Sequence, residues 1–309
     1  MQSRISIIIA GPTAVGKTDV ACRVAKKFGC EIISADARQI YRGMVIGTAA
    51  PLNPPIRHHL VGILNPSDRC TAAWWAQRAA EVMEGIRERE KMALVVGGTG
   101  LYIRALVEGI FPGPGEDMEF RAELQKRADA GENLHAELEI VDPIAAEQIH
   151  PNNLVRIIRA LEVYHITGEP LSKQFAQTIP IAENWQFLKF FLTRPREELY
   201  RRINGRTHHM LQNGWIEETK RLLDSGVSVS SPGMEAIGYK EIVRYFRGEL
   251  DKRELYEIIS QKTRNYAKRQ LTWFRHRPGY EEMNVKELGV EEVANRIIAS
   301  YNELKRVCG

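Results

Sequence analysis

Residues 11–18 have the types and spacing of a loop that binds phosphate groups. The loop consists of Gly11, Pro12, Thr13, Ala14, Val15, Gly16, Lys17 and Thr18. This order fits the pattern G-x-x-x-x-G-K-[ST], in which glycines let backbone N–H groups point at phosphate oxygens. The lysine adds a positive charge, and the threonine hydroxyl suits a Mg²⁺ ion. The pattern predicts a ligand that carries a di- or triphosphate and leaves the rest of that ligand open.

Two further segments carry polar side chains that could act on such a ligand. Residues 34–41 (SADARQIY) include Asp36, which could bind a metal ion, act as a general base or cap the next helix. They also include Gln39, whose amide could read the edge of a base. Residues 97–102 (GGTGLY) could let a ligand approach the backbone closely, with Thr99 either as a polar contact or as an ordinary helix cap. Spacing alone leaves these alternatives open.

A basic stretch lies near the other end of the chain. Residues 262–277 contain no acid, and their cations are Lys262, Arg264, Lys268, Arg269, Arg275 and Arg277. On a helix, Arg264, Lys268 and Arg275 share one face, while Tyr266, Trp273 and Arg277 share another. Cations beside aromatic rings suit single-stranded nucleic acid, where phosphates are neutralised and bases stack. The alternative is a solvated basic helix whose aromatic rings belong to the core.

Several other kinds of site are excluded by composition and spacing. The histidines at 58 and 59 are adjacent and would point to opposite faces of a strand, and no acidic or cysteine ligand lies at a zinc-like spacing. The four cysteines are scattered, which is typical of a reducing cytosol rather than of a disulfide framework. The apolar run at 5–10 is too short to span a bilayer, and no export signal is visible. We therefore expect a cytoplasmic protein that does not bind membranes.

Alternating strands and helices must position the candidate site residues of the phosphate loop and of the segments at 34–41 and 97–102. Short apolar runs predict strands at 5–10, 31–34, 92–96 and 187–192. Helical periodicity is visible at 17–28 and 72–90. The alternation predicts an α/β fold with a parallel sheet like that of phosphate-loop NTPases and with helices on both faces.

A cluster of prolines and glycines at 111–115 (FPGPG) interrupts the alternation of strands and helices. A helix-rich region of mixed charge follows it. We expect an all-helical lobe at 115–186, inserted between a first part of the core at 1–114 and its return at 187–309. The last part is expected to be helical almost to its end, apart from a loop at 225–233.

Taken together, the chain resembles one family, the tRNA dimethylallyltransferases, also called tRNA isopentenyltransferases. The matching segments are 11–18, 34–41, 46–49, 58–60, 96–102, 156–164, 195–206, 236–241 and 263–275. They run in family order and cover most of the chain.

The resemblance implies transfer of a dimethylallyl group from its diphosphate to N6 of the tRNA adenosine on the 3′ side of the anticodon, with release of diphosphate. The phosphate loop would then hold this diphosphate, together with Mg²⁺ at Thr18, rather than ATP. Asp36 aligns with the general base, while Thr13 and Lys17 complete the catalytic set. Arg202 and Arg206 are implied as further diphosphate ligands.

The resemblance also implies which residues contact tRNA. These residues are Asp36, Ala37, Arg38, Gln39, Thr99, Arg121, Arg156, Ile157, Ile158, Arg159 and Ala160. Arg264 and Lys268 of the basic stretch join them, and the inserted lobe is expected to clamp the anticodon stem. We expect a monomer whose partners are the tRNA anticodon stem-loop and dimethylallyl diphosphate.

Three positions depart from the family pattern. Ala37 replaces a serine that commonly follows the aspartate, and Val45 and Ala50 replace an acid and a lysine in the usual sequence Asp-Ile-Gly-Thr-Ala-Lys-Pro. Asp36 and Lys17 are both retained. We therefore expect the departures to change affinity or tRNA preference rather than the reaction.

Two other functions compete with prenyl transfer. The first hundred residues alone would permit a phosphate-loop kinase of small metabolites, although such a kinase has no need of the basic and aromatic stretch. A nucleic-acid-binding NTPase switch is the other alternative, but no apolar strand ends in the acid that would complete its metal site. Either one would turn over ATP without a prenyl donor.

Overall fold

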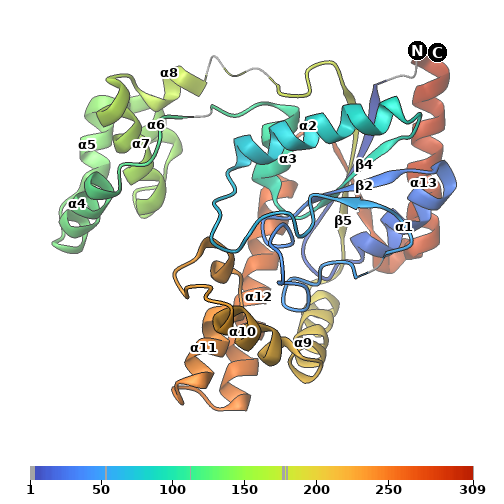
Figure 1. Cartoon of the computed structure of the whole chain (residues 1–309). Helices are drawn as coiled ribbons and strands as arrows, with labels where there is room; N and C mark the ends of the chain where they lie inside the picture. Colours follow the sequence, from blue (N-terminus) through green and yellow to red (C-terminus); the bar gives the residue numbers. More distant parts are fainter. Residues whose placement is uncertain (1–3, 53, 112, 176–177, 179, 309) are drawn as a thin grey trace. The chain divides into compact units, whose positions relative to one another are not determined.

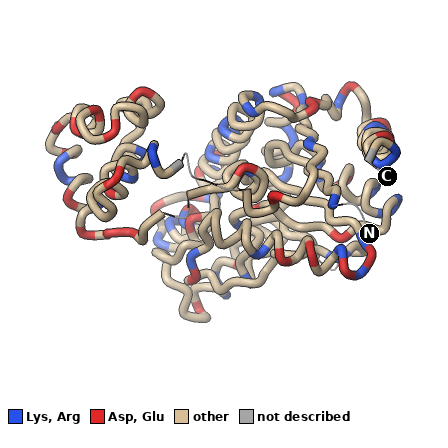
Figure 2. Tube along the Cα trace, turned by 90° about the horizontal axis from the view of Figure 1, so that it is seen from above, with Lys and Arg blue, Asp and Glu red and all other residues tan. Residues whose placement is uncertain are grey.

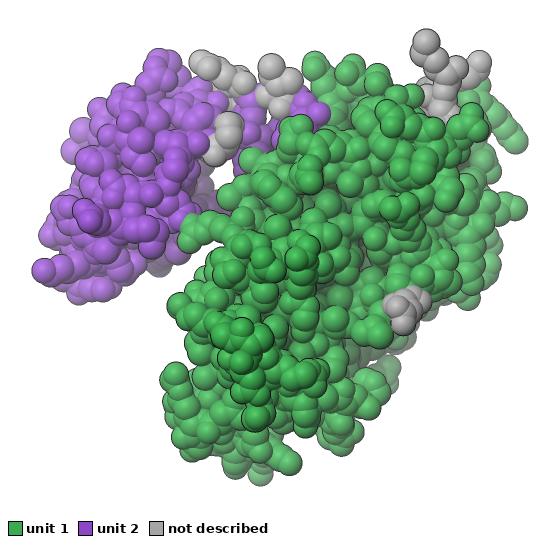
Figure 3. Space-filling view, viewed as in Figure 1, with its two compact units in different colours: residues 1–107, 182–309 green, residues 108–181 purple. Residues whose placement is uncertain are grey.

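The computed structural model of the chain describes residues 4–52, 54–111, 113–175, 178 and 180–308 (Figure 1). It divides into unit 1, residues 1–107 and 182–309, and unit 2, residues 108–181 (Figure 3). The expected lobe at 115–186 therefore lies a few residues too far along the chain at both ends. Residues 1–3, 53, 112, 176–177, 179 and 309, which belong to the expected domains, lie outside the described residues.

Unit 1 is built on a six-stranded sheet with the order β3-β2-β4-β1-β5-β6. The strands are β1 Ile5–Ala10, β2 Glu31–Ala35, β3 His58–His59, β4 Ala93–Gly97, β5 Gln186–Thr193 and β6 Tyr280–Asn284. All five pairings are parallel. The predicted α/β fold is confirmed, and the four predicted strands lie within one residue of their expected bounds.

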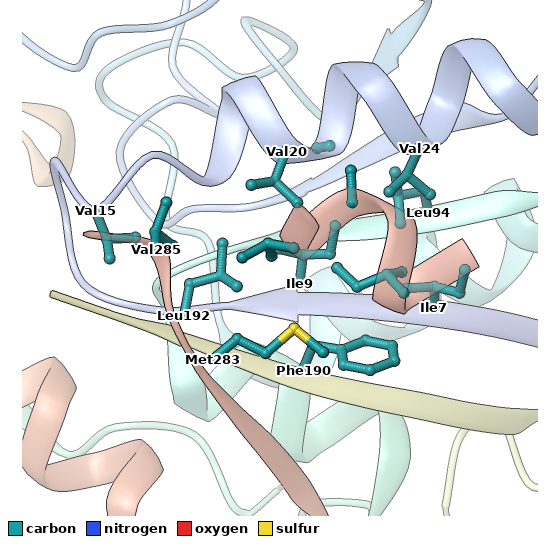
Figure 4. Close-up of a cluster of buried hydrophobic side chains, with 14 of the residues drawn as sticks. Ile7, Ile9, Val15, Val20, Val24, Leu94, Phe190, Leu192, Met283 and Val285 are labelled. Atoms are coloured by element: carbon teal, nitrogen blue, oxygen red, sulfur yellow. The ribbon is translucent and has the colours of Figure 1, made fainter. Parts of the chain in front are cut away.

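The strands β3 and β6 were missed, and the expectation of helix throughout the C-terminal part is wrong at β6. Strand β6 has the sequence YEEMN and lies at the sheet edge with both glutamates exposed, so it shows no apolar run. Its Met283 alone is buried, and it packs in the core beside Phe190 of β5 (Figure 4).

Helices cover both faces of the sheet. Those of unit 1 are α1 Lys17–Phe28, α2 Ala72–Glu88, α3 Gly100–Val107, α9 Arg196–Gln212, α10 Trp215–Asp224, α11 Tyr239–Phe246, α12 Lys252–Arg275 and α13 Val285–Cys308, with a short 3₁₀ helix at Pro232–Glu235. Alternate residues of β1 point to opposite faces, so Ile7 and Ile9 meet α1 and α13 (Figure 4). On the other face the Trp75 ring of α2 stacks on Tyr102 of α3, and Phe274 of α12 packs on Phe191 of β5.

The strand register brings three loops to one edge of the sheet. Ala10 of β1 pairs with Gly97 of β4, and Gly97 pairs with Ala35 of β2. The next residues along each strand are therefore neighbours at the carboxyl edge, where ligands bind in open parallel sheets. The phosphate loop, Asp36 and Thr99 all start from this edge.

Unit 2 is all-helical, as predicted. Its helices are α4 Met118–Asp129, α5 Leu134–Val141, α6 Pro143–Gln148, α7 Leu154–Thr167 and α8 Leu171–Phe175. Leu124, Leu138, Ile157 and Leu161 form its own apolar core. None of the described helices in either unit combines the length and apolar character that crossing a membrane requires.

Candidate active site

The phosphate loop has the conformation that its sequence predicts. It links β1 to α1, and Gly11 has a φ of 153°, so that a Cβ at this position would lie only 2.7 Å from the carbonyl oxygen of Leu192. Gly16 has a φ of 108° where α1 begins. A side chain at either position would strain the loop, so both glycines are required for its shape.

Lys17 is half-buried within the loop. Its ammonium donates hydrogen bonds to the carbonyl oxygens of Gly11 and Pro12 at 2.9 and 2.8 Å. Burial lowers the pKa of Lys17 to about 8; Asp36 opposes this effect and Arg206 adds to it. A weakly solvated cation of this kind gains strongly from a bound anion.

Three arginines donate hydrogen bonds to the phosphate loop. Two of them belong to α9, and the third lies just before this helix. Arg202 donates to the Ala14 carbonyl at 2.9 Å, Arg206 donates to the Thr13 hydroxyl, and Arg194 donates to the Val15 carbonyl at 2.7 Å. Burial lowers the pKa of Arg206 against the opposing effect of Asp36. Sequence reasoning missed Arg194, although its place just after the predicted strand at 187–192 was a usable signal.

A first cavity of about 440 Å³ lies over the phosphate loop. Its lining includes Thr13, Ala14, Val15, Gly16, Lys17, Thr18, Arg202 and Arg206, all of them expected diphosphate ligands. Gly11 and Pro12, the other two, are buried beneath it. Asp36, Ser34 and Gln39 line the same cavity. The structure therefore brings cations and donors from distant parts of the chain around one space of a size suited to a small ligand.

A second cavity of about 350 Å³ adjoins the first, and both are lined by Thr13, Asp36, Thr48 and Arg206. Its other walls include Ala37, Arg38, Thr99, Tyr266 and Arg269. Burial, and then the charge of Asp36, raise the pKa of Tyr266, so its phenol stays neutral. An aromatic ring, hydroxyls and cations around such a space suit a planar base with polar edges.

Asp36 both closes a turn and lines the two cavities. Its Oδ1 accepts hydrogen bonds from the backbone N–H groups of Arg38 and Gln39 at 2.8 and 3.2 Å, which closes the turn after β2. The same carboxylate lines both cavities. Because one oxygen fixes the turn, the carboxylate is held in place where the two spaces meet.

Gly98 and Gly100 follow β4 and leave space that side chains of α12 fill. The expectation that these glycines let a ligand approach the backbone is therefore wrong. A Cβ on Gly98 would lie 2.1 Å from the Gln270 amide nitrogen, and one on Gly100 would lie 2.1 Å from the Trp273 ring nitrogen. Thr99 is also no side-chain cap: its hydroxyl accepts a hydrogen bond from Ala37 N–H at 3.0 Å. It thereby ties the loop after β4 to the loop after β2.

Gln270 is a site residue that sequence reasoning missed. Its carbonyl oxygen accepts from Thr13 N–H at 2.9 Å, and its amide donates to the Gly98 carbonyl at 2.8 Å. It is buried, and it also lines the first cavity. A polar residue on the aromatic face of a predicted basic helix was the available signal. Through it, α12 contacts the phosphate loop directly.

The basic stretch divides its residues between surface and interior. Lys268 and Arg269 are exposed on α12. Arg264 is half-buried: it donates to Asn204 at 2.8 Å and lies over the Tyr200 ring, so it joins α12 to α9. Trp273 is half-buried and packs on the loop after β4, whereas Tyr266 lines the second cavity.

Five of the expected tRNA contacts have side chains that are buried in unit 2 or paired with an acid of that unit. Ile157, Ile158 and Ala160 are buried in the core of unit 2, where no RNA can reach their side chains. Arg121 and Arg159 both bind the buried carboxylate of Glu162, as their main ion pair. Arg156, by contrast, is exposed.

The amide of Gln39 is hydrogen-bonded within the protein. Its carbonyl oxygen accepts from the Ser34 hydroxyl at 3.0 Å, and its amino group donates to the carbonyls of Thr48 and Ala49 at 3.2 and 3.1 Å. The amide thus fastens the segment after β2 to the turn at 46–50.

The donors in the first cavity fit a Mg²⁺ ion. This ion keeps several waters and binds through one or two carboxylates plus phosphate oxygens, not through a cage of protein ligands. Thr18, Asp19 and Asp36 line the cavity with one hydroxyl and two carboxylates.

The two adjacent histidines form contacts within the protein. His59 contacts the Glu31 carboxylate at 2.7 Å, and His58 contacts the Ile56 carbonyl at 2.8 Å.

Comparison with known proteins places this site in a family. The family model described as IPP transferase matches residues 39–277, and one described as isopentenyl transferase matches residues 4–59. The chain belongs to the IPP transferase family. This IPP transferase is 45% identical to a tRNA dimethylallyltransferase of Geobacter sulfurreducens, over 88% of this chain and 89% of the relative. It is 43% identical to that of Pelotomaculum thermopropionicum, over 94% and 92%.

Solved structures agree with the assignment. A full-length tRNA isopentenylpyrophosphate transferase from Bacillus halodurans superposes with a TM-score of 0.72 at 35% identity, covering 99% of each chain. A eukaryotic dimethylallyltransferase, described as acting on tRNA, gives a TM-score of 0.78 at 25% identity, over 98% of this IPP transferase and 80% of that chain.

Proposed function

We propose that this IPP transferase moves a dimethylallyl group from dimethylallyl diphosphate to N6 of the tRNA adenosine on the 3′ side of the anticodon. The observation that carries the proposal is the pair of adjoining cavities with Asp36 in the wall of both. A diphosphate ester suits the cation-lined side, and a base suits the aromatic side. The names of the relatives supply the reaction that joins the two.

The phosphate loop binds the donor through its diphosphate. Lys17 and Arg206 are half-buried cations that line the first cavity, and Arg202 is a more exposed cation of the same lining. As the bond between C1 and the diphosphate oxygen breaks, its electron pair stays on the leaving diphosphate. Fixed cations stabilise that growing charge without reorganising, which is the largest contribution to many enzymatic rates.

Asp36 acts on the other side of the reacting carbon. The N6 lone pair forms the new bond to C1, and the proton that N6 loses passes to the Asp36 carboxylate. Adenine N6 is a weak nucleophile, so departure of the diphosphate leads and proton transfer follows. The turn that fixes Asp36 Oδ1 keeps the carboxylate oriented toward N6.

A bound Mg²⁺ would be held by Thr18 together with a carboxylate of the first cavity, and it would supply further positive charge to the diphosphate.

The acceptor base enters the second cavity after leaving its stack, as enzymes that modify bases require. Tyr266 and the segment at 236–237 offer apolar surface to the ring, and Arg38 and Thr99 offer polar contacts. Lys268 and Arg269, exposed on the same helix as Tyr266, are placed to neutralise phosphates of the anticodon stem-loop. The monomeric state and the cytoplasmic location stay predictions.

A transfer assay tests the proposal. It uses radiolabelled dimethylallyl diphosphate, Mg²⁺ and unmodified tRNA with adenosine on the 3′ side of the anticodon. We expect label in the tRNA, and labelling about 10³-fold slower with Asp36→Asn. Absence of label in the wild type, with ATP turnover in the absence of donor, would replace this function by the small-metabolite kinase or the NTPase switch.

A further inference from the structure

A third hollow, here called the outer groove, lies on the far side of the turn at 46–50. It has a volume of about 350 Å³ and is lined by Gln39, Tyr41, Arg42, Gly43, Val45, Ala50, Pro51, Leu52, Val61 and Gly62. Arg42 is the one charged residue among these, and its guanidinium donates to the Gly62 carbonyl at 3.3 Å. The lining is otherwise mostly apolar, and 69% of the Leu52 surface is exposed to solvent.

Two of the three departures from the family pattern fall in this lining. The usual acid and lysine are replaced by Val45 and Ala50, whose backbones are hydrogen-bonded to each other across the turn at 2.9 Å. Their neighbours Thr48 and Ala49 line the first cavity instead. The turn therefore lies between the first cavity and the outer groove, and the two replaced positions on its groove side are uncharged and apolar.

Gln39 is the residue that separates the two spaces. Among the described lining residues, it alone belongs to both the first cavity and the outer groove. Its amide is fixed on the wall by the hydrogen bonds to Ser34, Thr48 and Ala49. The side chain therefore lies between the first cavity and the outer groove.

We propose that the outer groove is a second isoprenoid pocket and that Gln39 sets the length of the prenyl chain that the enzyme accepts. The inference rests on the proposed function. A dimethylallyl chain ends before Gln39, whereas the additional five carbons of a geranyl chain need the space behind it. With Gln39 shortened, that unit enters the groove and meets Val45, Ala50 and Leu52 rather than water.

The reaction is the same for both donors. The bond from C1 to oxygen breaks with its electron pair on the diphosphate, N6 bonds to C1, and the N6 proton goes to Asp36. The groove holds only the distal carbons, so it changes which donor fits and not the chemistry at C1.

The test is the ratio of kcat/KM for geranyl diphosphate to that for dimethylallyl diphosphate, with the same tRNA and mass spectrometry of the product. The wild type should strongly prefer dimethylallyl. Gln39→Ala should raise the ratio by about 10- to 100-fold, which is within the discrimination that an apolar pocket reaches for a single methylene. Gln39→Met keeps the bulk of the wall without the amide, and it should leave the ratio as in the wild type.

A second pair of substitutions tests the groove itself. Val45→Asp with Ala50→Lys, made in the Gln39→Ala protein, should cancel the gain because an apolar chain would then lie against charges. Gln39→Ser, which retains a hydroxyl toward Ser34, replaces Gln39→Ala if the latter loses thermal stability.

Three results would overturn the inference: a wild type that uses both donors equally, equal ratios for Gln39→Ala and Gln39→Met, or a gain that survives the two charges. A wild type without dimethylallyl transfer would instead refute the proposed function.

Discussion

Unit 1 and unit 2 carry opposite charge. Residues 108–181 contain 13 Asp and Glu against six Lys and Arg, a net charge of −7. Of the chain's 43 basic and 39 acidic residues, 37 and 26 are left for unit 1, a net charge of +11. Figure 2 shows the acidic positions spread over the helices of unit 2. The mild net charge of +4 for the whole chain hides this division.

The cations of unit 2 are also largely engaged with its own acids. Arg121 and Arg159 bind Glu162, whose side chain is fully buried, and Arg127 binds Glu132 and Glu137. Unit 1 also contains many ion pairs, but in addition Lys17, Arg202 and Arg206 line its first cavity, and Lys268 and Arg269 are exposed on α12. An inserted helical lobe therefore need not supply the electrostatic attraction for RNA. The candidate catalytic groups and the cations placed to attract phosphates lie in unit 1.

The strongest test of this division is Asp36→Asn. Removing the proton acceptor while keeping the shape should lower kcat by about 10³-fold, within the range of general base catalysis. The tRNA dissociation constant should change by less than about twofold, since the change removes no cation. Single-turnover transfer and filter binding measure the two quantities separately.

Asp224→Asn, an exposed change on α10, is the matched control for Asp36→Asn. Equal losses of turnover and of tRNA affinity in Asp36→Asn would assign Asp36 to binding instead.

Lys17 should give the second largest effect, with a distinctive dependence on pH. Its pKa is lowered to about 8, so the free enzyme loses the ammonium as pH rises through 8, well before an ordinary lysine would. Below pH 8 the charge is present, and kcat/KM for the donor should be flat. Above it, kcat/KM should fall by about tenfold per pH unit.

Lys17→Arg remains charged throughout this range and should remove the fall above pH 8, although its overall activity is lower. Lys17→Ala should lower kcat/KM by about 10²-fold at pH 7. A fall above pH 8 that persists in Lys17→Arg would assign the titration to another group.

Local sequence patterns predicted the parts of unit 1 that depend on neighbours in the chain. Strand β1, the phosphate loop and α1 follow one another without a gap, so the apolar run and the glycines determine them. Asp36 and Thr99 could be placed at one edge because parallel strands end together. Strand β6 was not predicted, because its exposed residues Glu281 and Glu282 leave no apolar run in the sequence.

The remaining site residues depend on contacts between distant segments. Gln270 bonds to Thr13 across 257 positions of sequence, and no local pattern links the two. The glycines at 98 and 100 looked like a ligand-binding loop because sequence shows that space is needed but not what fills it. In unit 2, Ile157 and Ala160 lay in a segment that matched the family, and only the packed helix shows that their side chains are buried.

Glu162→Gln tests whether unit 2 is dispensable for the chemistry. The buried carboxylate accepts from Arg121, Arg159 and Asp117 N–H, so the neutral amide leaves two guanidinium groups poorly paired. We expect a loss of about 2 kcal/mol in the stability of unit 2, less than for a fully buried ion pair because both arginines are partly exposed. Hydrogen exchange should rise in residues 108–181 only.

Donor binding should be unchanged in Glu162→Gln, as measured by the thermal shift with dimethylallyl diphosphate. Glu137→Gln, a more exposed carboxylate of the same unit, is the control. A weakened donor response would show that unit 2 supports the first cavity after all.

The smallest expected effect decides where tRNA phosphates are neutralised. Lys268→Ala with Arg269→Ala removes two exposed cations of unit 1, and Arg156→Ala removes one of unit 2. The double change should weaken tRNA binding by about fivefold and lower the slope of log K against log salt by about 1.5, near 0.7 to 0.9 per phosphate contact. Arg156→Ala should leave the slope within about 0.3, because the net negative charge of unit 2 repels the RNA backbone. A larger slope change from Arg156→Ala than from the double change would reverse the comparison and make unit 2 the phosphate-binding part.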